Sequence, residues 1–85
     1  MKRFADITND EIEEIYGYIS LNVKNARKIK NMTQTEIALS MGFTTATFYT
    51  NAENCANGKH FNLEHLIKIA KILDIDLSEL IKFPE

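Results

Sequence analysis

The sequence predicts an all-α domain built from five helices. Apolar residues recur at three- and four-residue steps along most of the 85-residue chain, and no stretch sustains the strict alternation typical of strands. With 45% hydrophobic residues, 26% charged residues, three glycines and one proline, the composition is that of a helix-rich globular domain. A chain of this length buries one core and leaves little room for a deep catalytic cleft, so we expect no enzymatic activity.

The first helix is expected from about residue 10 to residue 30, with Thr8 or Asn9 as its N-cap. Its apolar face consists of Ile12, Ile15, Ile19, Val23 and Ala26. Gly17 is a candidate bend. A helix of this length measures roughly 30 Å, which is more than a small core can cover. We therefore predict an N-terminal extension over residues 1–18 and a folded domain over residues 19–85.

The run from Thr33 to Phe48 predicts two short helices that cross at a sharp turn. Thr33 followed by Glu36 forms a capping box that opens a helix over about residues 34–41. Ala38 and Gly42 permit a close crossing, because glycine tolerates the positive φ that such a turn needs. The apolar residues expected to lock the two helices together are Ile37, Met41, Phe43 and Phe48.

The next helix is expected over residues 45–56, with Thr44 as its cap. Phe48, Ala52 and Cys55 give it an apolar stripe, and Asn57-Gly58 supplies a stop. Cys55 is interpreted as a core residue.

Two further helices complete the predicted fold. Asn62 caps the first of them, whose apolar face extends to Leu73 before Asp74-Ile75 ends it. Asp76 followed by Glu79 is a second capping box, which opens a short last helix that closes at Phe83-Pro84.

The net charge is −2, but the basic side chains are unevenly placed. Residues 21–31 carry four basic and no acidic side chains, directly before the predicted crossing helices. The basic rim that this segment predicts consists of Lys24, Arg27, Lys28 and Lys30, joined by Lys59. A solvated helix face is the alternative interpretation. Because local potential drives phosphate binding, the negative total does not exclude a nucleic-acid partner.

The sequence favours a cytoplasmic protein without metal or cofactor. The single cysteine forms no internal disulfide, Asp6 interrupts any N-terminal signal-like run, and no segment approaches the ~20 apolar residues of a membrane span. His60 and His65 stand five residues apart with one cysteine nearby, which matches no zinc spacing. We expect both histidines to be surface or capping residues.

The run from Arg27 to Leu80 resembles the lambda-repressor-like helix-turn-helix domains of phage repressors and bacterial xenobiotic-response-element regulators. The resemblance rests on Arg27 followed by Thr33-Gln34, on the Ile37-Ala38 to Met41-Gly42-Phe43 turn, and on the apolar series from Asn62-Leu63 to Leu80. It implies a five-helix domain whose third helix enters the DNA major groove, while the start of the second helix contacts the backbone.

Carried onto this chain, the resemblance implies a specific set of DNA contacts. Thr33 and Gln34 would hold phosphate, and Lys59 or His60 would meet phosphate after the third helix. The residues left to contact bases are Thr44, Thr45, Ala46, Thr47, Tyr49, Thr50 and Asn51. This set lacks arginine, lysine and glutamine, so the bidentate contacts to guanine and adenine that those side chains make are absent. Threonine methyl groups suit thymine methyls, which points to A·T-rich sites or shape readout.

One segment departs from the family pattern. The family's Glu-x-Gly segment follows the third helix, whereas here Glu53 stands five residues before Gly58. An insertion of about four residues equals roughly one helical turn, so we predict a third helix that is one turn longer. An arginine of the first helix commonly pairs with this glutamate in the family, and Arg27 with Glu53 is the predicted pair.

The function that follows is a sequence-specific regulator of transcription that binds double-stranded DNA and acts as a repressor. A homodimer on two half-sites is expected, because one such domain contacts few bases. The N-terminal apolar residues either fold back on the core or form the self-association surface; they are Phe4, Ile7, Ile12, Ile15, Tyr16 and Tyr18. The alternative is a protein-interaction module of the same fold, an antitoxin or phage-type modulator, whose uncharged third helix docks in the groove of a protein partner.

Overall fold

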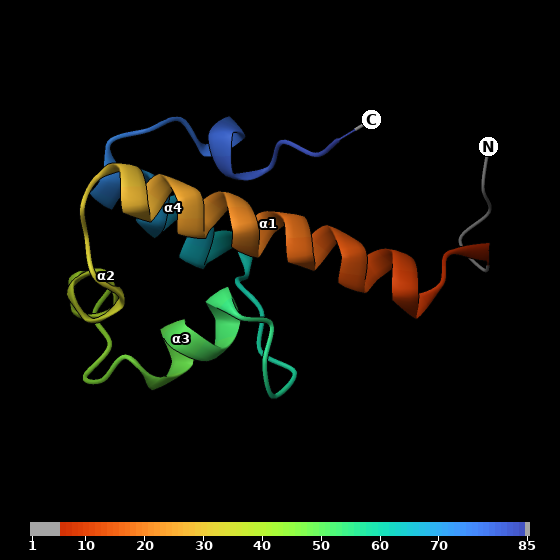
Figure 1. Ribbon diagram of the computed structural model, residues 1–85, viewed down its shortest axis with the longest axis horizontal. Coiled ribbons are helices and arrows are strands. Elements are labelled where there is room, and N and C mark those ends of the chain that lie inside the picture. The colour runs from red at the N-terminus through yellow and green to blue at the C-terminus, as the bar shows by residue number, and fades with distance from the viewer. Residues whose placement is uncertain (1–5, 85) are drawn as a thin grey trace.

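The computed structural model describes residues 6–84 and contains helices but no strand in that range, which confirms the all-α class (Figure 1). Its elements are α1 (Asn9–Ile29), α2 (Gln34–Ser40), α3 (Thr47–Glu53), α4 (Leu63–Leu73) and the 3₁₀ turn η2 (Leu77–Leu80). The prediction of five helices differs from the structure in the last element, which is a single 3₁₀ turn rather than an α-helix. Asp76 makes no side-chain hydrogen bond to η2, so the capping box predicted there is absent.

Thr8 caps α1, which is continuous through Gly17. The Thr8 hydroxyl accepts from the Glu11 amide at 3.1 Å, and the Thr8 amide donates to the Glu11 carboxylate at 3.0 Å. In α1 only Ser20, Val23 and Arg27 are buried, all in its C-terminal half. The N-terminal half projects beyond the rest of the molecule (Figure 1). The boundary predicted between residues 18 and 19 stays a prediction, and Phe4 lies outside the described residues.

The turn between α2 and α3 depends on Gly42. Thr33 caps α2 through the predicted capping box with Glu36. Ala38 is completely buried, and its carbonyl accepts from the Phe43 amide at 3.1 Å as the chain reverses. Gly42 has a φ of 99°, a conformation in which an L-residue is strained, which is why glycine stands at this position.

Helix α3 is shorter at both ends than the predicted range of residues 45–56. Thr44 does not cap it: the N-cap is Ala46, which makes no side-chain capping bond. The helix ends at Glu53 because Cys55 takes a left-handed conformation, with a φ of 52°, and the Ala56 amide donates back to the Asn51 carbonyl at 2.8 Å.

The inserted residues therefore form a loop, and the predicted extra helical turn is wrong. Cys55, two residues after Glu53, takes a left-handed conformation of the kind that glycine favours. Asn57 and Gly58 also have positive φ values of 55° and 67°, which keeps the chain out of helical geometry until α4 begins.

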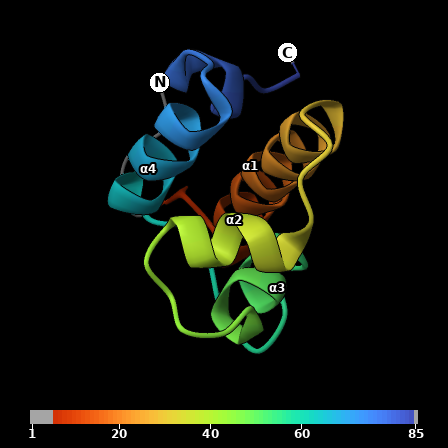
Figure 2. The same cartoon turned by 90° about the vertical axis from the view of Figure 1, so that its left-hand side faces the viewer.

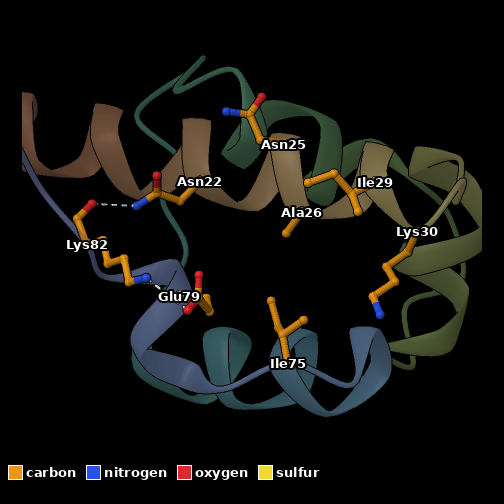
Figure 3. A pocket seen from close by; sticks show the side chains of 8 residues that line it. All are labelled: Asn22, Asn25, Ala26, Ile29, Lys30, Ile75, Glu79 and Lys82. Carbon is orange, nitrogen blue, oxygen red and sulfur yellow. Dashed lines mark hydrogen bonds and ion pairs between the residues drawn. The ribbon is translucent and has the colours of Figure 1, made fainter.

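Helix α4 and the C-terminal segment close the core. Asn62 caps α4 in a capping box with His65, one of the roles predicted for the histidines. The Asn22 amide of α1 donates to the carbonyls of Leu80 at 3.2 Å and Lys82 at 2.8 Å. Figure 3 looks into the hollow of about 340 Å³ between α1 and this segment, with Asn22 at one end and Lys30 at the other.

The core gathers residues from all four helices and from the loop before α4. Its buried apolar side chains are Val23, Ile37, Ala38, Met41, Tyr49, Ala52, Phe61, Leu66, Ile69, Ala70, Leu73 and Leu80. Phe43 and Phe48, predicted to lock the crossing helices, are partly buried, and their tilted rings lie with centroids 5.2 Å apart beside His65. No helix in residues 6–84 combines the length and the apolar character needed to cross a bilayer.

Candidate nucleic-acid interface

Helix α3 lies at the outer edge of the molecule, below α2 and away from α4 (Figure 2). Its inner side carries the buried residues Tyr49, Ala52 and Glu53. Of its other residues, Thr47 is exposed, whereas Phe48, Thr50 and Asn51 are half-buried. A peripheral helix exposed at its start, on a scaffold of three others, has the geometry by which helix-turn-helix proteins present side chains to a DNA groove.

Three exposed threonines, Thr44, Thr45 and Thr47, form what we name the threonine face. They occupy the approach to α3 and its first residue. The only hydrogen bonds found among them are long: the Thr47 amide and hydroxyl lie 3.4 Å from the Thr45 oxygen. The threonine face therefore keeps its hydroxyl and methyl groups available to a partner.

Tyr49 does not belong to the interface, although the resemblance suggested a base contact. Its side chain is completely buried and packs against Phe61, with ring centroids 5.3 Å apart. Burial, together with the neighbouring Glu53 carboxylate, raises the pKa of Tyr49. The buried stripe of α3 is Tyr49-Ala52-Glu53 rather than Phe48-Ala52-Cys55, and the three-residue step from Tyr49 to Ala52 was the available sequence signal.

The remaining predicted base contacts lie at the edge of the interface. Ala46 is partly buried and packs on the core. Thr50 is half-buried, and its hydroxyl donates to the Gln34 side-chain oxygen at 3.3 Å. Asn51 is half-buried and accepts from the Asn57 amide at 3.3 Å. These side chains border the threonine face, but each also serves the domain's own packing.

The predicted pair of Arg27 and Glu53 is confirmed, and it joins α1 to α3. The guanidinium donates twice, from Nε to Oε2 at 3.0 Å and from Nη2 to Oε1 at 2.9 Å. Nη1 donates to the Met32 carbonyl at 2.7 Å, and Gln34 Nε2 donates to Glu53 Oε1 at 3.1 Å. We call these three side chains, Arg27, Gln34 and Glu53, the α3 clamp, because they tie α1 and α2 to the buried end of α3.

The α3 clamp keeps its charges inside the protein. Burial alone would raise the pKa of Glu53, but hydrogen bonds from Arg27 and Gln34 hold that pKa below its ordinary value. The hydrogen bonds that Arg27 donates to the Glu53 carboxylate raise the pKa of Arg27. Arg27 is thus removed from the predicted basic rim, and the Gln34 amide, predicted to hold phosphate, is engaged by Glu53 and Thr50.

The basic rim is reduced to a few exposed lysines. Lys28 and Lys59 are exposed, Lys24 is half-buried, and none of the three forms an ion pair within residues 6–84. Lys24 and Lys28 are one turn apart on the flank of α1 nearer to the α3 side. Lys30 instead lines the hollow beside Ile75 (Figure 3).

The loop between α3 and α4 is attached to α1 by a ring stack and by a hydrogen bond from a cysteine thiol. The His60 ring stacks on Tyr16 with centroids 3.8 Å apart, and Nε2 of His60 lies 3.5 Å from the Glu13 carboxylate. The half-buried Cys55 donates to the Ser20 hydroxyl at 3.3 Å. His60 is therefore held away from the phosphate contact considered for it.

Comparison with protein families matches residues 23–80 to the helix-turn-helix family. Comparisons with curated proteins and with solved structures find no match. The matched range contains the α3 clamp, the Gly42 turn and the whole of α3 and α4, which are the parts that build the exposed helix. The chain therefore belongs to the lambda-repressor-like helix-turn-helix family of DNA-binding domains.

Proposed function

We propose that this protein is a sequence-specific, double-stranded-DNA-binding regulator that represses transcription in the cytoplasm by blocking access to its site. The observation that carries the proposal is the threonine face, which is exposed on the approach to α3 and at its first residue, while the buried α3 clamp fixes α3 to α1 and α2. A helix whose exposed start carries no obstructing charge is suited to enter the major groove.

The base contacts that this geometry supports come from Thr44, Thr45 and Thr47, with Ala46, Thr50 and Asn51 at the margin. A threonine hydroxyl donates or accepts one bond, and its methyl group packs against the thymine methyl. None of these side chains makes the bidentate contact that selects guanine. The proposed sites are therefore A·T-rich, with part of the selectivity coming from groove shape.

The backbone contacts proposed come from segments that precede and follow the threonine face in the sequence. Thr33 and Gln34 stand at the start of α2, and Lys59 stands in the loop after α3. The Thr33 oxygen already accepts from the Glu36 amide, so a phosphate there would be met mainly by backbone groups. Lys28 adds an exposed positive charge on α1.

The test is selection of bound sequences from a random duplex pool, repeated with Thr45→Ala and Thr47→Ala. Each substitution should change the preferred bases at one or two positions and weaken binding to the wild-type site by about fivefold to a hundredfold, the range expected for one lost base contact. Ser78→Ala, which removes a hydroxyl from η2, is the matched control and should bind as the wild type does.

Unchanged affinity and unchanged sequence preference in both threonine variants would refute the base-reading assignment. The uncharged threonine face and the net charge of −2 also suit a protein groove, so a protein-interaction module is the second candidate. One stoichiometric protein partner, lost on Thr47→Ala, together with no selected DNA sequence would favour that candidate.

A further inference from the structure

The His60 ring fixes the end of the loop between α3 and α4 to the N-terminal half of α1. It stacks on the Tyr16 ring with centroids 3.8 Å apart and planes 12° from parallel, and its Nε2 lies 3.5 Å from the Glu13 carboxylate. We name Tyr16 and His60 the loop anchor. We propose that the loop anchor positions Lys59, the residue directly before His60, for its contact with a DNA phosphate. This inference rests on the proposed function and assigns two positioning residues to it.

Helical spacing places the attachment points of α1 on one face. Glu13, Tyr16 and Ser20 follow one another at steps of three and four residues, so their side chains line one side of the helix. The Ser20 hydroxyl donates to the Ala52 carbonyl at 2.8 Å and accepts from the Cys55 thiol at 3.3 Å. All three α1 residues precede residue 23, where the family match begins. The loop is therefore held by a part of α1 that the family model does not cover.

The loop is also restrained by hydrogen bonds of its own. The Ala56 amide donates to the Asn51 carbonyl at 2.8 Å, and the Lys59 amide donates to the Ala56 carbonyl at 3.0 Å. The Asn57 side-chain amide donates to the Asn51 side-chain oxygen at 3.3 Å. A loop that is tied both to α1 and to the end of α3 loses little conformational freedom on binding. Its contact with a partner is then not offset by the cost of ordering the loop.

The loop reaches the same edge of the molecule as the start of α3. In Figures 1 and 2 the loop after α3 and the first turn of α3 both lie at the lower edge, with α1 and α4 above them. Asn57, Gly58 and Lys59 are exposed, and Lys59 makes no ion pair with another residue of the described range 6–84. A duplex that receives the threonine face therefore also runs past the loop, where the Lys59 ammonium is available to a phosphate.

His60 acts through Lys59 rather than on DNA directly. Its side chain is 23% exposed, one face of the ring is covered by Tyr16, and Nε2 lies beside Glu13. Its Nδ1 is buried and has no hydrogen-bond partner among residues 6–84. The ring thus offers no donor to a phosphate, and its contribution is the flat surface that stacks on Tyr16. Without this stack, the loop would have to be ordered when DNA binds.

The experiment is a double-mutant cycle on affinity for the selected duplex, in which Lys59→Ala is combined with loss of the loop anchor. His60→Ala and Tyr16→Ala should each weaken binding by about threefold to tenfold when Lys59 is present, because the loop must then be ordered on binding. In the Lys59→Ala background each should change affinity by less than about twofold, because the contact that the anchor supports is already absent. The two alanine variants remove opposite sides of one stack, so either of them tests it if the other does not fold.

Two further variants separate positioning from general stability. Tyr18→Ala is the matched control, because it removes a tyrosine of α1 whose ring lies near Phe83 rather than near the loop, and it should bind as the wild type does. His60→Phe restores a ring to the stack and should recover most of the affinity that His60→Ala loses. Circular dichroism establishes that each variant is folded. Hydrogen exchange at the Lys59 amide should be about tenfold faster in His60→Ala than in the wild type, as expected for a loop released from α1.

Equal effects of His60→Ala with and without Lys59, or an unchanged exchange rate of the Lys59 amide, would overturn the inference, since the stack would then contribute only to stability. If Thr45→Ala and Thr47→Ala lower affinity as expected while the cycle shows no coupling, this inference fails and the proposed function stands. If the wild type selects no DNA sequence, the proposed function fails and the positioning role fails with it.

Discussion

At the scale of single residues, burial distinguishes two side chains of α3 that were both predicted to contact DNA bases. Thr47 and Tyr49 are two positions apart, yet Thr47 is exposed and Tyr49 is completely buried. A seven-residue helix has too few positions for its apolar repeat to show which of its residues face the core. The Arg27–Glu53 pair was predictable because it joins two charged residues with a known family role. The engagement of Gln34 with both Glu53 and Thr50 was not, since it depends on how closely α2 approaches α3.

The α3 clamp predicts a large effect of one substitution. Glu53→Ala leaves the Arg27 guanidinium buried without its carboxylate, and should lower the free energy of unfolding by about 3 kcal/mol. Glu79→Ala removes the exposed pair with Lys82 and should cost less than about 1 kcal/mol. Urea denaturation of both variants checks this. Equal effects of the two substitutions would show that the clamp does not stabilise the fold.

Acid should destabilise the domain in two steps. Burial lowers the pKa of His65, and the α3 clamp lowers the pKa of Glu53, so both groups favour folding in their deprotonated forms. The His65 contribution is complete above its ordinary pKa of 6.5 and is lost as the pH falls through the lower folded value. The Glu53 contribution is complete above 4.5 and is lost at lower pH.

His65→Gln separates the two steps. Glutamine also serves at this position of a capping box but does not titrate. The variant is expected to be less stable than the wild type at neutral pH, because it loses the ring contacts with Phe43 and Phe48. Its unfolding free energy should stay level from pH 7 to about pH 5 and then fall. If the unfolding free energy of the variant falls between pH 6.5 and pH 5 as steeply as that of the wild type, another group is responsible for the first step.

At the scale of elements, sequence reasoning succeeded where a side-chain cap marks the helix end. Thr33 forms the predicted capping box with Glu36, Asn62 caps α4 as predicted, and Thr8 rather than Asn9 caps α1. Helix α3 has no such cap: Ala46 contributes no capping side chain. The helix ends at Glu53, and the residue with positive φ beyond it is Cys55, a residue type that rarely adopts that conformation. The ends of α3 are set by the Gly42 turn and by the packing of the α3–α4 loop on α1. Neither can be predicted from a local sequence pattern.

Two glycine substitutions should have opposite signs. Gly17 lies within α1 with no heavy atom near the place of an added Cβ, so Gly17→Ala should raise the unfolding free energy by about 1 kcal/mol. Gly42 also has open space but a φ of 99°, so Gly42→Ala should lower that free energy by about 1–2 kcal/mol. Thermal melting compares the two variants. A stabilising Gly42→Ala would mean that the turn relaxes to negative φ at no cost.

At the scale of the whole molecule, the domain carries little of the positive charge that DNA-binding proteins use. The described arginine is enclosed in the α3 clamp, and Lys30 faces the hollow beside the C-terminal segment. Lys24, Lys28 and Lys59 remain on or near the side of α3. The charge distribution along the sequence located this basic segment correctly, but only the structure showed how much of it is committed to internal contacts.

This distribution predicts a shallow salt dependence of DNA affinity. About three phosphate contacts per copy, at a slope of about −0.9 each, give a slope of log affinity against log salt of roughly −3. Lys28→Ala should reduce the slope by about one unit, whereas Lys71→Ala, on the last turn of α4, should leave it unchanged. Filter binding between 50 mM and 200 mM salt measures both. A wild-type slope near zero would contradict backbone binding altogether.

The threonine face has a consequence for how this protein can diverge. Thr44, Thr45 and Thr47 are exposed, and their side chains make no hydrogen bond to any other helix in residues 6–84. Substitutions at these positions therefore alter what α3 touches without altering whether the domain folds. Mutations in the threonine face can therefore change the operator sequence that the protein binds. The stability of the domain stays the same, because it depends on the α3 clamp and the core.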